Sequence, residues 1–168
     1  MTTTGGTSAG GPVKSRSVAD SRTEMATIVL PADTNNYGHI FGGRVLAMAD
    51  KVAAMVAMRH CRQPVVTASI DRVDFIRPIK SGMIVIFKGA INAAFNTSME
   101  IGVDVEAENP LTGERITACR ALLTVVAIDR NGRPVPIPPL ELRTQEERDR
   151  AARAAERRRQ RLATREAF

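Results

Sequence analysis

One carboxylate stands out in the first half of the chain. Residues 41–59 have the composition of a helix, because they are rich in Ala, Met, Leu and Val and contain no proline. The only charges before the last residue of this segment are Arg44, Asp50 and Lys51. Asp50 has no basic residue three or four positions away. Burying an unpaired carboxylate costs several kcal/mol or raises its pKa, and a raised pKa is typical of a general base. Asp50 is therefore a candidate general base, although spacing alone fits equally well with a carboxylate that faces water or caps a neighbouring backbone.

Glycines mark the point where the chain turns into this helix. Gly38 precedes the helix, and the pair Gly42-Gly43 stands at its start. Glycine lets a backbone come close to a ligand, and the free amides of a helix N-terminus stabilise negative charge. The segment could bind an oxyanion, although glycines at a helix start are also common for conformational reasons alone.

The rest of the chain indicates a sheet. Strands are expected at residues 24–30, 65–76, 83–95, 98–107 and 116–128, separated by turn-rich segments that contain Gly, Pro, Asn and Asp. Long strands of this kind need an apolar partner, and the only long apolar helix is the one that carries Asp50. The predicted fold class is therefore α+β, with an antiparallel sheet wrapped around a central helix.

Composition favours one domain with distinct ends. The chain has 168 residues, of which 43% are hydrophobic, and this is enough for a single core. We expect a flexible tail rich in Gly, Ser and Thr at residues 1–22, one domain at 23–140 and a charged, helical extension at 141–168. The longest apolar stretch is shorter than the ~20 residues of a membrane span, and the N-terminus does not look like a secretory signal. These features predict a cytoplasmic protein without a membrane segment.

Much of the basic charge lies in the C-terminal extension. The formal net charge is +6, and residues 141–168 contain nine arginines against six acids. Such a segment is more often a solvated charged helix than a nucleic-acid arm. Aromatic residues make up only 4% of the chain, so few side chains are available to stack on bases. No nucleic-acid partner is expected.

The cysteines and histidines do not form a recognisable metal or disulfide pattern. Cys61 and Cys119 are too few for a disulfide framework, and the two histidines lack zinc-ligand spacing. The adjacent His60 and Cys61 could form a catalytic pair, but sequence neighbours at a helix end rarely have the required geometry. We expect reduced, structural thiols and no bound metal.

Six segments follow one another in a specific order. They are Leu30–Gly43, Met48–Asp50, Thr67–Phe75, Asn96–Glu100, Thr112–Arg115 and Asp129–Pro138. Each segment is unremarkable by itself, but in this order and spacing they resemble the acyl-coenzyme A (acyl-CoA) thioesterases of the hotdog fold, in the bacterial group with short-chain to broad acyl specificity. The resemblance covers residues 23–140. It implies a long helix wrapped by a five- or six-stranded antiparallel sheet.

The resemblance also implies an activity and an assembly. The activity is hydrolysis of an acyl-CoA substrate to a carboxylic acid and free coenzyme A, which needs no separate cofactor. The assembly is a homo-oligomer, at least a dimer with continuous sheets and active sites at the dimer interface, and in its full form a hexamer made of three dimers.

Individual roles follow from the same resemblance. The catalytic carboxylate of the family falls on Asp50, its catalytic asparagine on Asn35 with Asn36 as the adjacent alternative, and its glycine pair on Gly42 and Gly43. Asp50 would act as a general base on water or as a nucleophile. The amide of Gly43 would bind the oxyanion, and Asn35 of the opposite subunit would orient the water or the carbonyl.

Coenzyme A carries phosphates, so its site needs cations and hydrogen-bond donors. The resemblance places coenzyme A near the strand and turn that carry Arg72, Phe75, Arg77 and Lys80, and near Thr97, Ser98 and Met99. Each of the three basic residues could equally be solvated surface charge.

Other functions can use the same scaffold. A non-catalytic acyl-CoA sensor would keep the binding residues but would have no use for Asp50 and Asn35, so the presence of both favours hydrolysis. A dehydratase would need an Asp/His pair in a hydratase motif, and none is found around Asp50.

Overall fold

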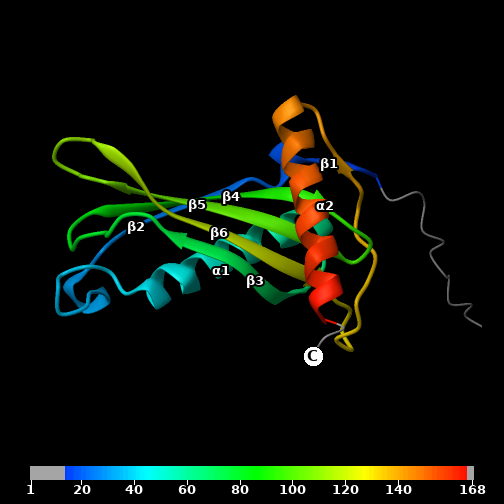
Figure 1. Ribbon diagram of the computed structural model, residues 1–168, viewed down its shortest axis with the longest axis horizontal. Coiled ribbons are helices and arrows are strands. Elements are labelled where there is room, and N and C mark those ends of the chain that lie inside the picture. The colour runs from blue at the N-terminus through cyan, green and yellow to red at the C-terminus, as the bar shows by residue number, and fades with distance from the viewer. Residues whose placement is uncertain (1–13, 166–168) are drawn as a thin grey trace, which may run out of the picture.

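The computed structural model describes residues 14–165, which form one long central helix, a five-stranded antiparallel sheet and a second helix (Figure 1). The central helix is α1 (Gly42–Cys61), and the strands of the main sheet are β2 (Thr23–Ile28), β3 (Val65–Phe75), β4 (Ile84–Ala94), β5 (Ser98–Glu108) and β6 (Arg115–Ala127). The other elements are the short strands β1 (Arg16–Ser17) and β7 (Leu140–Glu141), the 3-10 turns Val18–Asp20 and Pro31–Asp33, and the helix α2 (Gln145–Arg165). The expected α+β architecture is confirmed.

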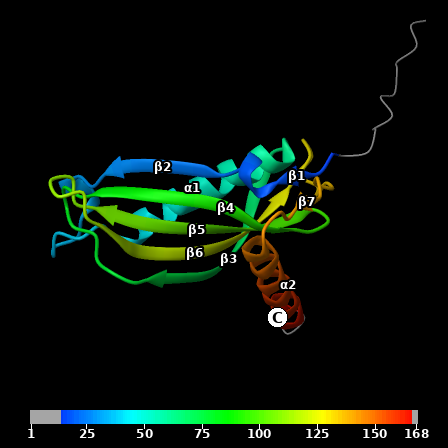
Figure 2. The same ribbon diagram turned by 90° about the horizontal axis from the view of Figure 1, so that it is seen from above.

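Within residues 14–165, the sheet has two free edges. Its strand order is β2-β4-β5-β6-β3, so that β2 and β3 lie at the outside (Figure 2). Among the described strands, β3 pairs only with β6. Three of its apolar residues are exposed to solvent: Val66 is 45% exposed, Ile70 42% and Phe75 57%. An apolar strand edge of this kind is a template for pairing with another strand.

α1 packs on one face of the sheet through a stripe of small and β-branched residues. Val45, Ala49, Val52, Ala53, Val56 and Ala57 recur along one side of the helix, and each is at most 2% exposed. On the sheet, Met99, Ile101 and Val103 of β5 alternate with Glu100 and Gly102, so the apolar side chains all face α1. The core of the molecule is therefore the interface between α1 and the sheet.

The helix comes very close to the sheet at Gly89 of β4. A Cβ atom built on Gly89 would lie 2.6 Å from Cγ1 of Val52 and 2.8 Å from Cγ2 of Val56. Both distances are far shorter than the ~3.5–4.0 Å of a favourable carbon contact. Any side chain at this position would push α1 away from the strands, so Gly89 sets the depth at which α1 lies.

Replacing Gly89 by alanine should lower the free energy of unfolding by about 1–3 kcal/mol, because the added methyl group overpacks the contact with Val52. Urea denaturation of wild type and variant measures the difference. Val52→Ala is the matched test. In the wild-type background it opens a cavity and destabilises the protein, whereas in the Gly89→Ala background it relieves the shorter of the two overlaps, leaving the one with Val56, and is less harmful. Additive losses in the double variant would contradict the close contact.

The segment at residues 14–22 differs from the flexible tail expected for residues 1–22. Arg16–Ser17 pairs in parallel with Leu140–Glu141, and the amide of Arg16 donates to the carbonyl of Pro139 at 3.0 Å. Val18 is 3% exposed and joins the core. One buried valine thus anchors a segment whose composition is otherwise that of a linker. The remainder of the predicted tail, residues 1–13, lies outside the described residues.

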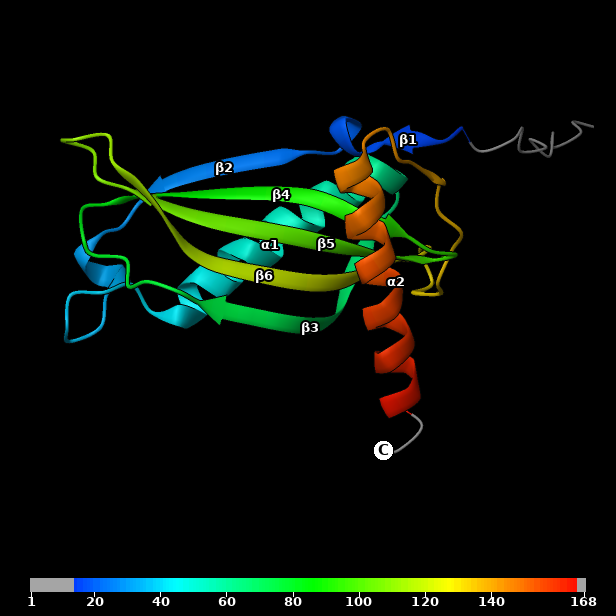
Figure 3. The ribbon, with the colours of Figure 1, turned by 45° about the horizontal axis from the view of Figure 1, so that its top comes forward.

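α2 crosses the sheet on the face opposite α1 (Figure 3). Arg157 forms a two-pronged pair with Glu100 of β5 at 2.6 and 3.0 Å, and Arg161 contacts Asp71 of β3 at 2.7 Å. The side chain of Glu100 is only 2% exposed. The expectation of a solvated charged helix is therefore wrong for these two arginines, which neutralise acids on the outer face of the sheet. In the described part of the chain, no helix is long and apolar enough to cross a membrane.

Candidate functional site

Asp50 lies in the middle of α1 and contacts the edge strand β3. The hydroxyl of Thr67 donates a hydrogen bond to Oδ1 of Asp50 at 2.6 Å. This is a short hydrogen bond for a hydroxyl donor and an oxygen acceptor. The second oxygen, Oδ2, makes no hydrogen bond within residues 14–165, and the residue is partly buried. The arrangement holds one oxygen of the carboxylate and leaves the other available to a ligand.

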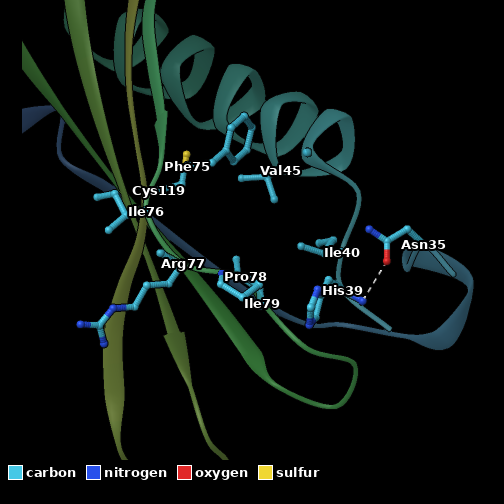
Figure 4. A pocket seen from close by; sticks show the side chains of 12 residues that line it. Asn35, His39, Ile40, Val45, Phe75, Ile76, Arg77, Pro78, Ile79 and Cys119 are labelled. Atoms are coloured by element: carbon cyan, nitrogen blue, oxygen red, sulfur yellow. Dashed lines mark hydrogen bonds between the residues drawn. The ribbon is translucent and has the colours of Figure 1, made fainter. Parts of the chain in front are cut away.

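A cleft of about 340 Å³ opens at the N-terminus of α1 (Figure 4). One wall comes from the loop and first helical turn, with Asn35, His39, Ile40, Gly42 and Val45, and the other from residues 75–79 together with Ala118 and Cys119. Most of these side chains are apolar. The cleft therefore combines an apolar lining with a helix N-terminus, where negative charge is stabilised.

Asn35 is held in a turn beside this cleft. Its Oδ1 accepts hydrogen bonds from the amide of Tyr37 at 2.9 Å and from the amide of His39 at 3.2 Å, the second of which is drawn in Figure 4. The side-chain NH₂ group of Asn35 is left as a donor with no partner in the described chain. Asn36 is exposed. The two hydrogen bonds fix the orientation of the Asn35 side chain, whereas they do not involve the side chain of Asn36.

The first turn of α1 presents two glycine amides. The amides of Gly42 and Gly43 lie in the first turn, where no carbonyl of the helix can accept from them. The N-cap residue, Phe41, supplies no side-chain acceptor either. The ring of Phe75 covers Gly42, because a Cβ atom there would lie 3.1 Å from its Cζ, whereas a Cβ atom on Gly43 would meet nothing within 4 Å. The backbone at Gly43 is open to an approaching ligand.

Asp50 and the cleft are not adjacent within one chain. The eight residues from Gly42 to Asp50 correspond to ~12 Å along the helix axis, and Asp50 does not line the cleft. A single reacting carbonyl cannot contact the amides of the first turn and Asp50 of the same helix. A complete site made from these groups needs a second copy of the chain.

The residues expected to bind coenzyme A lie at opposite ends of the sheet. Phe75, Arg77 and Lys80 lie at the end of β3 and in the turn after it, whereas Thr97 lies in the turn between β4 and β5 and Ser98 is the first residue of β5. Ser98 is opposite Val126, whose other neighbour is Val66 near the start of β3. The two groups are therefore separated by nearly the length of β3, roughly 30 Å.

Two further residues predicted for that site have other contacts. Arg72 is ion-paired with Asp74 at 2.7 Å and faces a second cleft, beside α2. Met99 is 0% exposed, because the alternation of β5 turns its side chain toward α1. In this structure Met99 packs in the core and is not on the surface of the chain.

Neither cysteine is placed to act as a nucleophile. Burial, assisted by the nearby carboxylate of Asp74, raises the pKa of the Cys119 thiol to about 11, and burial also raises the pKa of Cys61. Nε2 of His60 donates to the carbonyl of Pro138 at 2.8 Å, and burial lowers the pKa of this imidazole. His60 is thus a neutral core residue and not the base of a Cys-His pair. Within residues 14–165, no cluster of three or more His, Cys, Asp or Glu is placed to hold a metal ion.

Thr67 is the contact of Asp50 that sequence reasoning missed. It belongs to the segment Thr67–Phe75, whose pattern predicts a strand but does not show which residue faces the helix. The sequence did offer one indication: Thr67 carries a hydroxyl and lies on a strand expected to pack against the helix of Asp50, whose carboxylate has no partner on that helix.

Comparison with known proteins defines the class to which this site belongs. The profile of the thioesterase superfamily matches residues 37–114, which include all of α1. The uncharacterized acyl-CoA thioester hydrolase YkhA of Bacillus subtilis is 40% identical over 134 residues, which make up 80% of this chain and 78% of that protein. The chain belongs to the thioesterase superfamily, and its fold is the hotdog fold.

Other relatives are acyl-CoA hydrolases by name. The rat cytosolic acyl coenzyme A thioester hydrolase is 34% identical over 135 residues, but the chain spans only 35% of its length. A crystal structure of an apo-hexameric acyl-CoA thioesterase has a TM-score of 0.86 and 43% identity, and the match covers 90% of this chain and 97% of that one. An acyl-CoA hydrolase from Staphylococcus aureus, solved with butyryl coenzyme A, coenzyme A and coenzyme A disulfide, has a TM-score of 0.83 and 34% identity over 89% of this chain and 92% of that one.

The Staphylococcus aureus hydrolase has also been solved with alanine in place of one aspartate, one asparagine or one threonine. In that protein the aspartate follows the asparagine by 15 residues, and the threonine follows the aspartate by 17. Asn35, Asp50 and Thr67 have the same two separations.

Proposed function

We propose that this protein hydrolyses acyl-CoA thioesters to a carboxylic acid and free coenzyme A, with Asp50 as the catalytic carboxylate. The observation that carries the proposal is the 2.6 Å hydrogen bond from Thr67 to Asp50. These two residues and Asn35 have the spacing of the three residues replaced in the Staphylococcus aureus acyl-CoA hydrolase. The names of the relatives in Bacillus subtilis and rat support the same substrate class.

Hydrolysis of a thioester needs an activated water, a polarised carbonyl and a thiolate that leaves. Thr67 holds Oδ1 of Asp50, so Oδ2 would take the proton from water as the water attacks the carbonyl. Alternatively, Oδ2 would attack the carbonyl itself, the C–S bond would break with release of the thiolate, and water would then open the resulting anhydride. General base catalysis of this kind typically contributes ~10²–10⁴-fold to the rate.

Negative charge on the carbonyl oxygen would be stabilised at the N-terminus of α1. The amide of Gly43 and the helix dipole would act together, and one such donor is typically worth ~3 kcal/mol of the barrier. The NH₂ group of Asn35, which the turn leaves free, would orient the water or the carbonyl. In this proposal the helix contributes its N-terminus in one subunit and Asp50 in the other.

Pairing of two β3 edges would assemble the complete site. A twofold axis beside β3 would pair the two strands antiparallel, continue the sheet and cover Val66 and Ile70. Antiparallel pairing places the Phe75 end of one β3 beside the Val65 end of the other. The cleft with Asn35 would thereby approach the Thr67–Asp50 contact of the partner. Similarity to the apo-hexameric acyl-CoA thioesterase supports further assembly of three dimers into a hexamer.

Coenzyme A would lie across the same interface. Arg77 lines the cleft and Lys80 is exposed in the same turn, so both can meet phosphates. Thr97 and Ser98 would approach from the second subunit. Arg72, which is already paired with Asp74, is the weaker candidate.

A cytoplasmic location is part of the same proposal. Cys61 and Cys119 are both unpaired thiols, as is usual in reducing compartments. The similar rat protein is named as cytosolic.

Asp50→Asn should keep the fold and the oligomer but lower kcat by about 10²–10⁴-fold, because an amide cannot accept the proton of the attacking water. A thiol-release assay with acyl-CoA esters from acetyl to palmitoyl measures the rate, and circular dichroism and size-exclusion chromatography check the fold and assembly. Asp104→Asn, an exposed acid on the outer face of the sheet, is the matched control. A near wild-type rate for Asp50→Asn would remove Asp50 from the mechanism. Binding of acyl-CoA without any hydrolysis by the wild type would instead identify a non-catalytic sensor.

Asp50→Asn and Asn35→Ala, each nearly inactive alone, should regain activity when their subunits are mixed. A mixed dimer has one site with both substitutions and one site with neither. An equal random mixture is therefore expected to recover about a quarter of wild-type activity, because half of the dimers are mixed and each has one intact site. Co-expression with two different tags produces the mixed dimers. No recovery in purified mixed dimers would show that both residues act from the same subunit.

Arg77→Glu should raise the KM for acyl-CoA about tenfold, which corresponds to ~1.4 kcal/mol of binding free energy, while kcat changes less. The reason is the reversed charge beside the phosphates, and the difference should shrink at high salt. Arg148→Glu, on α2 and on the other face of the sheet, is the control. An unchanged KM for Arg77→Glu would exclude Arg77 from the binding site.

A further inference from the structure

The carboxylate of Asp71 is the centre of a polar network beneath α2. It accepts hydrogen bonds of 2.7 Å from the hydroxyls of Ser69 and Thr124, and Nη1 of Arg161 approaches it at the same distance. The side chain of Asp71 is 11% exposed and that of Arg161 is 21% exposed. A charge-assisted contact with three partners in such a setting is far stronger than an exposed ion pair. The C-terminal helix is thus bonded directly to the strand that carries Thr67.

β3 is irregular where it carries these residues. Thr67 pairs with Val125 and Ser69 with Thr124, so one extra residue is inserted between them, and a second irregularity follows between Ile70 and Arg72. In a regular strand, residues two apart face the same side. The first bulge breaks this rule, because Thr67 faces Asp50 on α1 whereas Ser69 bonds Asp71 on the α2 side. Without the bulge, Thr67 and Ser69 could not face opposite sides of the sheet.

The position of Arg161 is fixed by the preceding turn of α2. Arg157, one helical turn earlier, makes the two-pronged pair with Glu100, and Asn92 donates to the same carboxylate at 2.9 Å. Because Glu100 is buried, this contact anchors α2 on the sheet. Arg161 therefore reaches Asp71 from an element that is held independently of β3.

We propose that Arg161 is a positioning residue for the site: by bonding Asp71 it holds the bulge of β3 in the form that turns Thr67 toward Asp50. Arg161 does not contact the substrate or Asp50 itself. The inference rests on the proposed function, because its effect is read out through the carboxylate that performs hydrolysis. In this proposal the arginine-rich helix α2 affects catalysis indirectly, because it bonds the strand that positions Thr67.

Loss of the Arg161 contact should lower kcat and leave KM unchanged. Arg161→Gln is expected to reduce kcat on the order of tenfold, because small misplacement of a catalytic group is costly, while KM stays within about twofold, since neither Asp71 nor Arg161 lines the cleft. Arg161→Lys keeps a charge for Asp71 and should restore most of kcat. The control is Arg159→Gln on the same helix, whose ion pair is to Glu156 of α2 itself. Full-length proteins are compared at a temperature at which thermal unfolding shows every variant to be folded.

The decisive measurement repeats Arg161→Gln in a Thr67→Ala background. If Arg161 acts through Thr67, its replacement should cause no further loss of kcat once Thr67 is gone. The same fold-loss in both backgrounds, or an unchanged kcat in Arg161→Gln alone, would overturn the inference. If Arg161→Gln does not fold, Asp71→Asn removes the same charge contact and is expected to give the same pattern. A wild type that releases no thiol from any acyl-CoA would overturn the proposed function itself, which is a different outcome from an active wild type with an indifferent Arg161.

Discussion

The close packing of α1 against the sheet depends on Gly89 of β4, because any side chain at that position would overlap the helix. The absence of a side chain there allows Val52 and Val56 to sit against the backbone of β4. This contact sets both the depth and the rotation of α1. Because Asp50 lies two residues before Val52, the same rotation turns Asp50 out of the core and toward β3, where Thr67 meets it. The first-turn amides of α1 are delivered to the cleft by the same packing.

The edge strand β3 serves several parts of the molecule at once. Its inner face presents Thr67 to Asp50, its outer face presents Asp71 to α2, and its free edge exposes apolar side chains. These uses conflict in a regular strand, because Thr67 and Asp71 are four residues apart and strict alternation would place both on the same face. The bulges resolve the conflict, and α2 lies where it can hold them. The site, the assembly surface and the C-terminal helix are therefore linked through one strand.

Local features were predictable from sequence, and long-range ones were not. Composition and flanking turns placed the central helix at 41–59, close to the observed Gly42–Cys61, and the pattern of residues 98–107 matched Ser98–Glu108 within one residue. Asp50 was found because it broke an apolar pattern. Thr67 was missed because its direction depends on a bulge that is held by a contact between residues 90 positions apart. The role of α2 was hidden for a similar reason, since Glu100 lies in a strand whose alternation makes it look solvent-facing.

Cys119 lines the cleft in which the proposed reaction would release a thiol at every turnover. Burial raises the pKa of Cys119 to about 11, so at neutral pH the thiol is almost entirely protonated. Thiol–disulfide exchange requires the thiolate, so this side chain would rarely form a mixed disulfide with the disulfide of a released product. It would equally resist acylation by an incoming thioester. The burial that packs Cys119 into the core thus keeps its thiol protonated, so this side chain would line the cleft without reacting with the thiols and thioesters that pass through it.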